Sequence, residues 1–198
     1  QEVREHLLSI SNNKIKVKLL DKNQGISGAT NEAASLASGD YILLMDNDDE
    51  LAHSALHEFY QKIKKDGSEI LYSDMDIIDA KGRTRDPLCK PDWSPDLFLS
   101  QMYLGHLVGF KKSLFDEVGG FRSEFNGSQD YDLLLRMTEK TDKIGHVAEI
   151  LYHWRDLPSS TAANPESKPY AQIAGLNAIQ EHLNRVYGLG KAIAHETD

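Results

Sequence analysis

The sequence has a single cysteine, Cys89, among its 198 residues, so no disulfide can form within the chain. It has no apolar run near the ~18 residues that a membrane span requires. Positive charge is scarce, because 22 Lys and Arg are outnumbered by 31 Asp and Glu, which gives a formal net charge of -9. These absences exclude a disulfide-built scaffold and argue against a general nucleic-acid binder. The lone cysteine fits a reducing compartment.

The remainder is typical of a globular domain, with 40% hydrophobic residues and no internal repeat. Segments with strand character alternate with helical segments, which predicts an α/β fold with a mostly parallel sheet. The expected strands are 14–20, 41–45, one or two within 69–78, 106–110 and 147–154. The expected helices are 28–39 with Ser27 as N-cap, 52–65, 97–104, 111–118, 128–140 and 170–187, and residues 87–95 are expected to be irregular.

An acidic cluster, Asp46-Asn47-Asp48-Asp49-Glu50, follows the nearly all-apolar run YILLM. Ligands of α/β sheets bind at the C-terminal ends of strands, where this cluster stands. Carboxylates at ~4 Å repel by about 4 kcal/mol at a dielectric constant of 20, and a divalent cation removes that repulsion. The simpler interpretation is an acidic loop that caps the next helix, a role that suits Asp49.

The acidic cluster does not match two other acidic motifs. Counted from Asp46, an EF-hand would need Gly and Glu where Leu51 and His57 stand. A DxDxT phosphatase is disfavoured because the cluster lacks the threonine.

A second acidic pair, Asp130 and Asp132, opens the expected helix 128–140. Complementing the helix dipole explains Asp132. Asp130 is a candidate general base, since a carboxylate suits that role when it reaches an acceptor hydroxyl.

Three segments occur together and in order: NQGISGATNEAASLASGDYILLMDNDDEL, FNGSQDYDLLLRM and LYHWR. The set closely resembles family 2 glycosyltransferases of the GT-A fold. The resemblance runs over nearly the whole chain, and SDMDIIDAKGR, KPDWSPDLFLSQ and GHLVGFKKSL are similar to bacterial members that build surface polysaccharides. It implies a GT-A, Rossmann-like mixed sheet flanked by helices.

The resemblance also implies roles for single residues. Asp46 and Asp48 match the DxD motif, with Asp48 holding Mn²⁺ or Mg²⁺ on the donor diphosphate and Asp46 contacting the donor sugar or ribose, or sharing the metal. Asp130 matches the catalytic base, beside Gln129 where relatives carry Glu. His153 matches a histidine that completes the metal site in some relatives, with a packed strand-end histidine as an equal alternative.

Further positions follow less directly from the resemblance. Arg155 would neutralise the diphosphate, and Asn31 would lie near the nucleotide, although Thr30 stands where many relatives carry Arg. Trp93, His106 and Gln129 are weak candidates for acceptor contacts, with structural roles favoured for Trp93 and His106. Hydrogen-bonding roles are favoured for Asp74 and Asp76.

The family's first strand, reading like SVIIPxYN, and a second strand ending in an Asp-rich turn are not found in this sequence. We therefore expect residues 1–198 to be one GT-A domain, an N-terminally truncated fragment with a C-terminal helix at about 169–187. Open strand edges would favour self-association and weak or absent activity.

The resulting hypothesis is an inverting, metal-dependent transferase that moves a sugar from a nucleotide-diphosphate sugar, with UDP-sugar as the first guess, to a glycan or lipid-linked acceptor. The expected location is the cytoplasm, with peripheral association at the inner membrane face left open, and no nucleic-acid partner is expected. Two alternatives remain: a non-catalytic relative that binds nucleotide, metal or glycan, and a nucleotidyltransferase.

Overall fold

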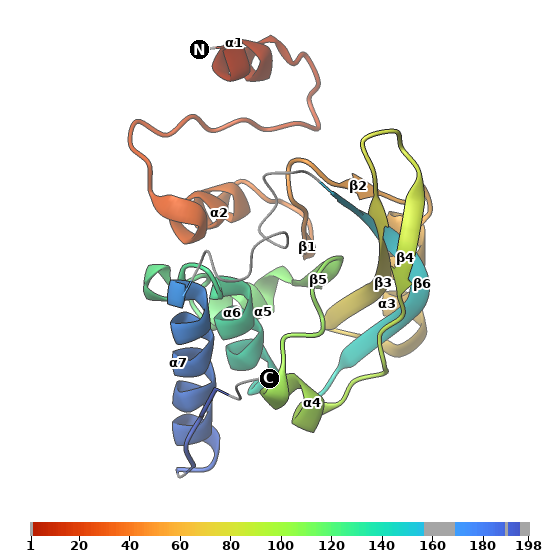
Figure 1. Cartoon of the computed structure of the whole chain (residues 1–198). Coiled ribbons are helices and arrows are strands. Elements are labelled where there is room, and N and C mark those ends of the chain that lie inside the picture. Colours follow the sequence, from red (N-terminus) through yellow and green to blue (C-terminus); the bar gives the residue numbers. More distant parts are fainter. Residues whose placement is uncertain (1, 157–168, 189, 195–198) are drawn as a thin grey trace.

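The computed structural model describes residues 2–156, 169–188 and 190–194. Helices and strands alternate along much of this part of the chain (Figure 1). The helices are α1 (Glu2–Ser9), α2 (Gly25–Ser35), α3 (Ala55–Asp66), α4 (Pro95–Ser100), α5 (Lys112–Glu117), the 3-10 turn η1 (Ser123–Phe125), α6 (Gln129–Thr138) and α7 (Pro169–Val186). The strands are β1 (Tyr41–Leu44), β2 (Glu50–Leu51), β3 (Ile70–Ile78), β4 (Thr84–Leu88), β5 (Val108–Lys111) and β6 (Ile144–Arg155).

The strands form one mixed sheet in the order β1-β5-β3-β6-β2, with β4 paired to β3. The expectation of a mostly parallel sheet is wrong, because within the described residues only the β3–β6 pairing is parallel. β5 runs opposite to both of its neighbours, and β3 turns directly back into β4, which only antiparallel strands can do through a short turn. The mixed sheet implied by the family resemblance is the correct description.

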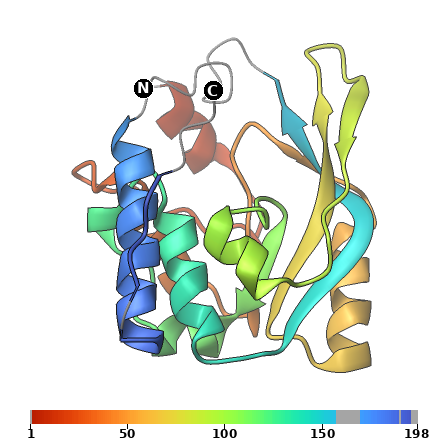
Figure 2. The ribbon, with the colours of Figure 1, turned by 60° about the horizontal axis from the view of Figure 1, so that its bottom comes forward.

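Both faces of the central strand β3 are buried, and its side chains alternate between two cores. Ile70 and Tyr72 pack with α4, α5, α6 and α7 on one face, whereas Leu71 packs with Ala55 and Phe59 of α3 on the other. Figure 2 shows α3 on one side of the sheet and the larger group of helices on the opposite side. Packing on both faces thus fixes the sheet whose strand ends carry the acidic residues.

Some expected boundaries differ in the structure. Residues 14–20 form no strand, because an extended segment becomes a strand only by pairing with another, and this one lies beside α2, where Lys16 Nζ donates to the Leu36 carbonyl at 2.8 Å. β4 lies partly in the segment expected to be irregular, and its residues are exposed along its whole length. Ser27 is buried inside α2 rather than capping it, and the expected helix 97–104 is the shorter α4.

The C-terminal helix predicted at about 169–187 is confirmed as α7. α1, in contrast, has no buried residue, and Figure 1 shows it away from the sheet. Within the described residues, no helix is both long and apolar enough to cross a membrane. That residues 1–198 form one truncated domain stays a prediction.

Candidate active site

The turn between β1 and β2 carries the acidic cluster, and Tyr152 of β6 holds it. The buried Tyr152 hydroxyl accepts a hydrogen bond from the Asp46 backbone N–H at 3.1 Å and donates one to the Asp49 carboxylate. Asp49 also accepts from the Arg155 backbone N–H at 2.8 Å. Asp49 therefore ties the turn to β6, and the expectation that it caps the next helix is wrong: Ser54 precedes α3 as its N-cap residue.

Arg155 closes the same turn from the end of β6. Its Nε donates to the Asp48 backbone carbonyl at 2.6 Å, and its guanidinium pairs with the Glu50 carboxylate. The structure thus gives Arg155 a clamping role in the turn. Its contact with a diphosphate stays a prediction.

His106 lies beside Asp46 in the segment just before β5, with its Nε2 3.5 Å from Asp46 Oδ2. The imidazole lowers the pKa of the Asp46 carboxyl below its usual range, against the opposing effect of burial. The His106 ring stacks on the Tyr152 ring, with 5.1 Å between centroids and 26° between planes. Asp46, His106 and Tyr152, which are far apart in the sequence, are therefore neighbours in the fold.

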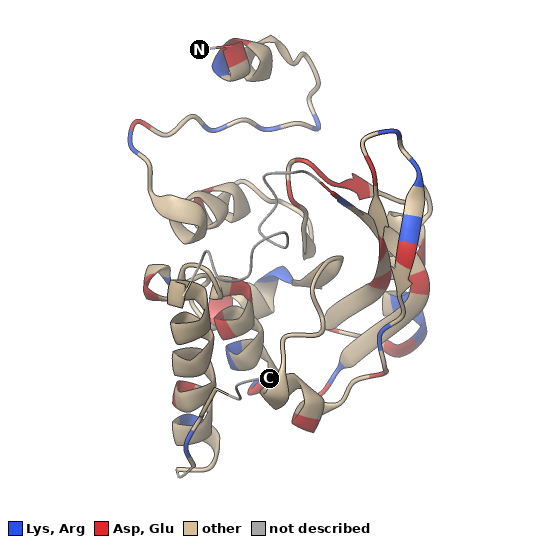
Figure 3. Cartoon of the chain, viewed as in Figure 1, with Lys and Arg blue, Asp and Glu red and all other residues tan. Residues whose placement is uncertain are grey.

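Asp130 faces this group from the first turn of α6. A cleft of about 730 Å³ is lined by Asp46, His106, Gln129 and Asp130 together with Met45 and Tyr170. Burial raises the pKa of Asp130, whereas a hydrogen bond from the Tyr131 backbone N–H and the charge of the nearby His106 lower it. Figure 3 shows acidic residues at the turn after β1 and at the start of α6. The two carboxylates singled out in the sequence thus share one cleft.

The predicted metal ligands are not preassembled. Asp48 is exposed, and its carboxylate makes no hydrogen bond or ion pair within the described residues. The His153 ring contacts Asp76 through Nδ1 at 2.6 Å, which leaves Nε2 for another partner. Across the described part of the chain, no three His, Cys, Asp or Glu side chains are grouped so as to hold a metal.

One predicted residue, Asn31, makes its contacts outside the cleft. The Asn31 side chain donates to the Phe121 carbonyl and accepts from the Phe121 N–H, both at 2.9 Å, and so fastens α2 to the loop after α5. Gly120 has φ of +72°, and a Cβ there would lie 2.8 Å from Asn31 Oδ1. Asn31 does not line the cleft, and its place near the nucleotide stays a prediction.

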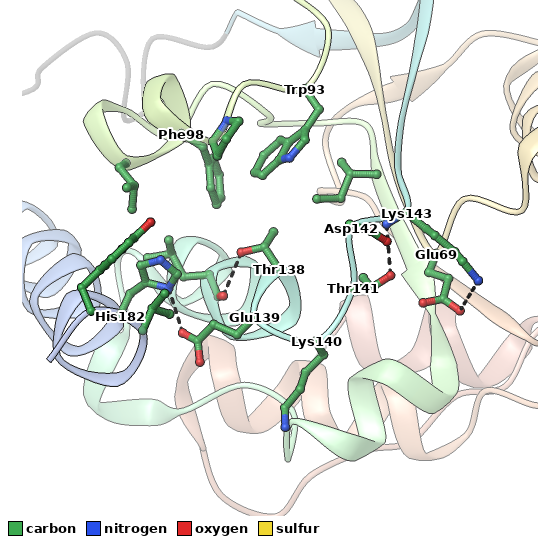
Figure 4. A pocket seen from close by; sticks show the side chains of 16 residues that line it. Glu69, Trp93, Phe98, Thr138, Glu139, Lys140, Thr141, Asp142, Lys143 and His182 are labelled. Carbon is green, nitrogen blue, oxygen red and sulfur yellow. Dashed lines mark hydrogen bonds and ion pairs between the residues drawn. The ribbon is translucent and has the colours of Figure 1, made fainter.

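Trp93 lines a different cavity, of about 660 Å³, between α4, the α6–β6 turn and α7. Figure 4 shows Trp93 and Phe98 on one side of it, with His182 paired to Glu139 on another. None of Asp46, Asp48 and Asp130 lines this cavity. The structure therefore separates Trp93 from the other site residues, whereas His106 and Gln129 do reach the acidic cleft.

The sequence reading missed Tyr152 as part of the site. Its signal was present in LYHWR, where a tyrosine in a strand presents an apolar ring and a polar tip that needs a partner once buried. The partner, 106 residues away in sequence, becomes visible only in the fold.

Comparison with known proteins agrees with this architecture. The family model described as "Glycosyl transferase family 2" matches residues 1–119. Among the most similar relatives, an uncharacterized protein of Sinorhizobium fredii, y4gI, is 42% identical over 88% of this chain and 20% of its own length. The O-antigen biosynthesis protein RfbC of Myxococcus xanthus is 36% identical over 87% of this chain and 14% of its own length. The chain thus spans a fifth or less of these relatives.

A solved structure of S. aureus TarS in complex with UDP-GlcNAc superimposes with a TM-score of 0.68 at 17% identity, covering 92% of this chain and 53% of that one. This likeness confirms the predicted GT-A fold. The family model covers more than half of the chain, and so the chain belongs to glycosyl transferase family 2.

Proposed function

We propose that this chain transfers a glycosyl group from a nucleotide-diphosphate sugar to an acceptor hydroxyl, with inversion at the anomeric carbon. The observation that carries the proposal is the shared cleft of Asp46 and Asp130 in a member of this family. Because the chain spans a fifth or less of the relatives named above, the activity of the whole protein is part of the proposal.

Asp130 acts as the general base. It takes the proton from the acceptor hydroxyl as that oxygen attacks the anomeric carbon, and the diphosphate leaves from the opposite face. Burial raises the pKa of Asp130, and a base with a pKa closer to the working pH transfers protons more effectively. Its partly buried position in the lining of the cleft supports this role.

Asp48 is the residue that would hold a divalent cation, Mn²⁺ or Mg²⁺, on the donor diphosphate. Its carboxylate is exposed and makes no hydrogen bond or ion pair within the described residues, and Mg²⁺ commonly binds one or two carboxylates together with substrate phosphates. The cation would offset the charge that develops on the leaving diphosphate. His153 fits as an additional ligand, because a carboxylate on one ring nitrogen is the usual support of a metal-bound histidine.

The donor and acceptor are proposed by class. UDP is the first nucleotide to test, since TarS has been solved with UDP and with UDP-GlcNAc. The acceptor is a glycan or a lipid-linked glycan, in line with the O-antigen biosynthesis named for the Myxococcus relative. Location in the cytoplasm or at the inner membrane face stays a prediction.

The test is calorimetric titration of UDP, dTDP and GDP into the chain, with and without Mn²⁺. We expect micromolar binding of one nucleotide, lost without Mn²⁺ and in Asp48→Ala. Asp142→Ala, an exposed aspartate in the other cavity, is the matched control and should bind like the parent.

Other outcomes would contradict the proposal. If no nucleotide binds, and adding the natural flanking sequence does not restore binding, a non-catalytic role becomes the better explanation. Release of pyrophosphate instead of a nucleoside diphosphate would identify a nucleotidyltransferase.

A further inference from the structure

Lys90 is a buried lysine that donates to two backbone carbonyls. Its side chain is almost inaccessible to solvent, and its Nζ lies 2.5 Å from the Leu104 carbonyl oxygen and 2.7 Å from that of His106. Its backbone N–H donates to Asp74 at 2.9 Å. Burial lowers the pKa of Lys90 to about 8, and the Asp74 carboxylate acts against this. A buried ammonium needs such partners to be tolerated.

The carbonyls that Lys90 holds belong to a segment with no regular structure. Residues 101–107 lie between α4 and β5, and Gly105 has φ of +47°. Strand pairing begins only at Val108, although the Leu107 carbonyl already accepts from the Ser73 N–H at 3.1 Å. The Lys90 ammonium therefore supplies hydrogen-bond donors to the carbonyls of this segment, as a neighbouring strand does for the carbonyls of β5.

The His106 ring depends on its backbone for its position. Its Nδ1 is buried and has no hydrogen-bond partner within the described residues. The contacts left to the ring are the stacking on Tyr152 and the 3.5 Å approach to Asp46. Without a hydrogen bond at its inner nitrogen, the ring is placed by these two contacts and by where its main chain is held.

We propose that Lys90 is a positioning residue: by holding the Leu104 and His106 carbonyls it keeps the His106 imidazole in the cleft, beside Asp46 and near Asp130. The placement of the ring follows from the contacts alone, and only its consequence for sugar transfer rests on the proposed function. The segment KPDWSPD, in which sequence reading pointed to Trp93, would then contribute to the site through its lysine.

The first experiment needs no substrate. Imidazole ¹H–¹⁵N spectra of the unliganded chain are recorded for the parent, Lys90→Met and Lys81→Met, with the His106 signals assigned from His106→Gln. Lys81 is an exposed lysine on the β3–β4 turn whose side chain makes no hydrogen bond or ion pair within the described residues, so it is the matched control. We expect the His106 signals to shift or double in Lys90→Met only.

Circular dichroism and thermal unfolding would show that each variant is folded. Should Lys90→Met not fold, Lys90→Leu, which also removes the side-chain donor, takes its place. Unchanged His106 signals in a folded Lys90 variant would overturn the proposal.

The second experiment is a double-mutant cycle on sugar transfer. Removing the partners that orient metal-ligating residues lowers activity by about 10–100-fold, and we expect a loss of similar size in kcat/KM for Lys90→Met. In the His106→Gln background the same substitution should have little further effect, because Lys90 would act through His106. Additive losses would overturn the proposal. A parent that transfers no sugar would contradict the proposed function, while the imidazole spectra still decide the role of Lys90.

Discussion

Asp130 and Asp132 stand two residues apart at the start of α6, yet one lines the open cleft and the other is completely buried against two arginines. The Asp132 carboxylate pairs with Arg136 Nη2 at 2.7 Å and with the Arg122 guanidinium. Residues two apart on a helix do not share a face. Within one helical turn, therefore, one aspartate is available to a ligand in the cleft and the other is part of a buried ion-pair network.

Asp130→Asn should separate activity from stability. We expect transfer to fall about 10²–10⁴-fold, the range for removing a general base. The folded-state pKa of Asp130 is raised above the unfolded value of 3.8, so the stability linked to its proton is complete below pH 3.8 and is lost as pH rises through the folded pKa. Removing the charge should therefore raise the free energy of unfolding at pH 7, measured with urea.

The control for this prediction is the same comparison of parent and variant at low pH. At pH 3 Asp130 is mostly protonated in both states, and the stability difference between parent and Asp130→Asn should largely disappear. A less stable variant at pH 7 would show that burial does not dominate at this carboxyl.

Asp132→Asn should be severely destabilising. Arg136 also donates to the Val118 and Gly120 carbonyls at 2.6 and 2.7 Å, so the buried guanidinium is fixed in place and would lose its counter-charge. Breaking one side of a buried ion pair costs about 3–5 kcal/mol, and urea unfolding would measure it. The matched control is Asp116→Asn, which removes another i,i+4 pair, with Lys112, on an exposed side chain and should cost at most ~1 kcal/mol.

Tyr152→Phe tests whether the acidic turn is held from β6. The change leaves the Asp46 N–H and the buried Asp49 carboxylate without their shared partner, which should cost about 1–3 kcal/mol of unfolding free energy. Because that turn carries Asp48, we also expect weaker Mn²⁺-dependent nucleotide binding in calorimetry.

Tyr41→Phe separates the two effects. It also removes a tyrosine hydroxyl, which donates to the Ser68 carbonyl at 2.7 Å at the start of β1, away from the turn. It should lower stability and leave nucleotide binding unchanged. Equal loss of binding in both variants would mean that Tyr152 acts through stability alone.

The part of the site that was predictable from sequence is local. The run YILLM followed directly by Asp46 and Asp48 indicates a strand end with an acidic turn, and Asp130 stands at the start of a helix whose periodicity is plain. Each of these two patterns is contained within a short stretch of sequence. They therefore need no knowledge of which strands pair.

What could not be predicted depends on contacts between distant segments. Residues 14–20 alternate like a strand but form none, whereas β4 is exposed and contains Pro87, so its pattern is weak. The hydrogen bonds of Tyr152 and Lys90 join partners that are 106 and 16 residues away. A buried lysine is also rare enough that sequence reading assigns it to the surface.

The buried tyrosines predict a loss of stability at high pH. Burial raises the pKa of Tyr131 from 10 to about 12, and it raises the pKa of Tyr72 and Tyr152 as well. For a group whose folded pKa is raised, the linked stability is complete below the unfolded value and is lost as pH rises through the folded value. For Tyr131 this window is pH 10–12 and corresponds to about 3 kcal/mol.

Tyr131→Phe should therefore be less stable than the parent at pH 8, because the Phe98 carbonyl loses its donor, yet lose less stability between pH 10 and pH 12. Urea unfolding at pH 8, 10, 11 and 12 measures both effects. Tyr60→Phe removes a hydroxyl from a ring that is 57% exposed and should follow the parent's pH dependence. If Tyr131→Phe lost as much stability as the parent over that interval, the alkaline transition would have to come from other groups, with Tyr72 and Tyr152 the next to replace.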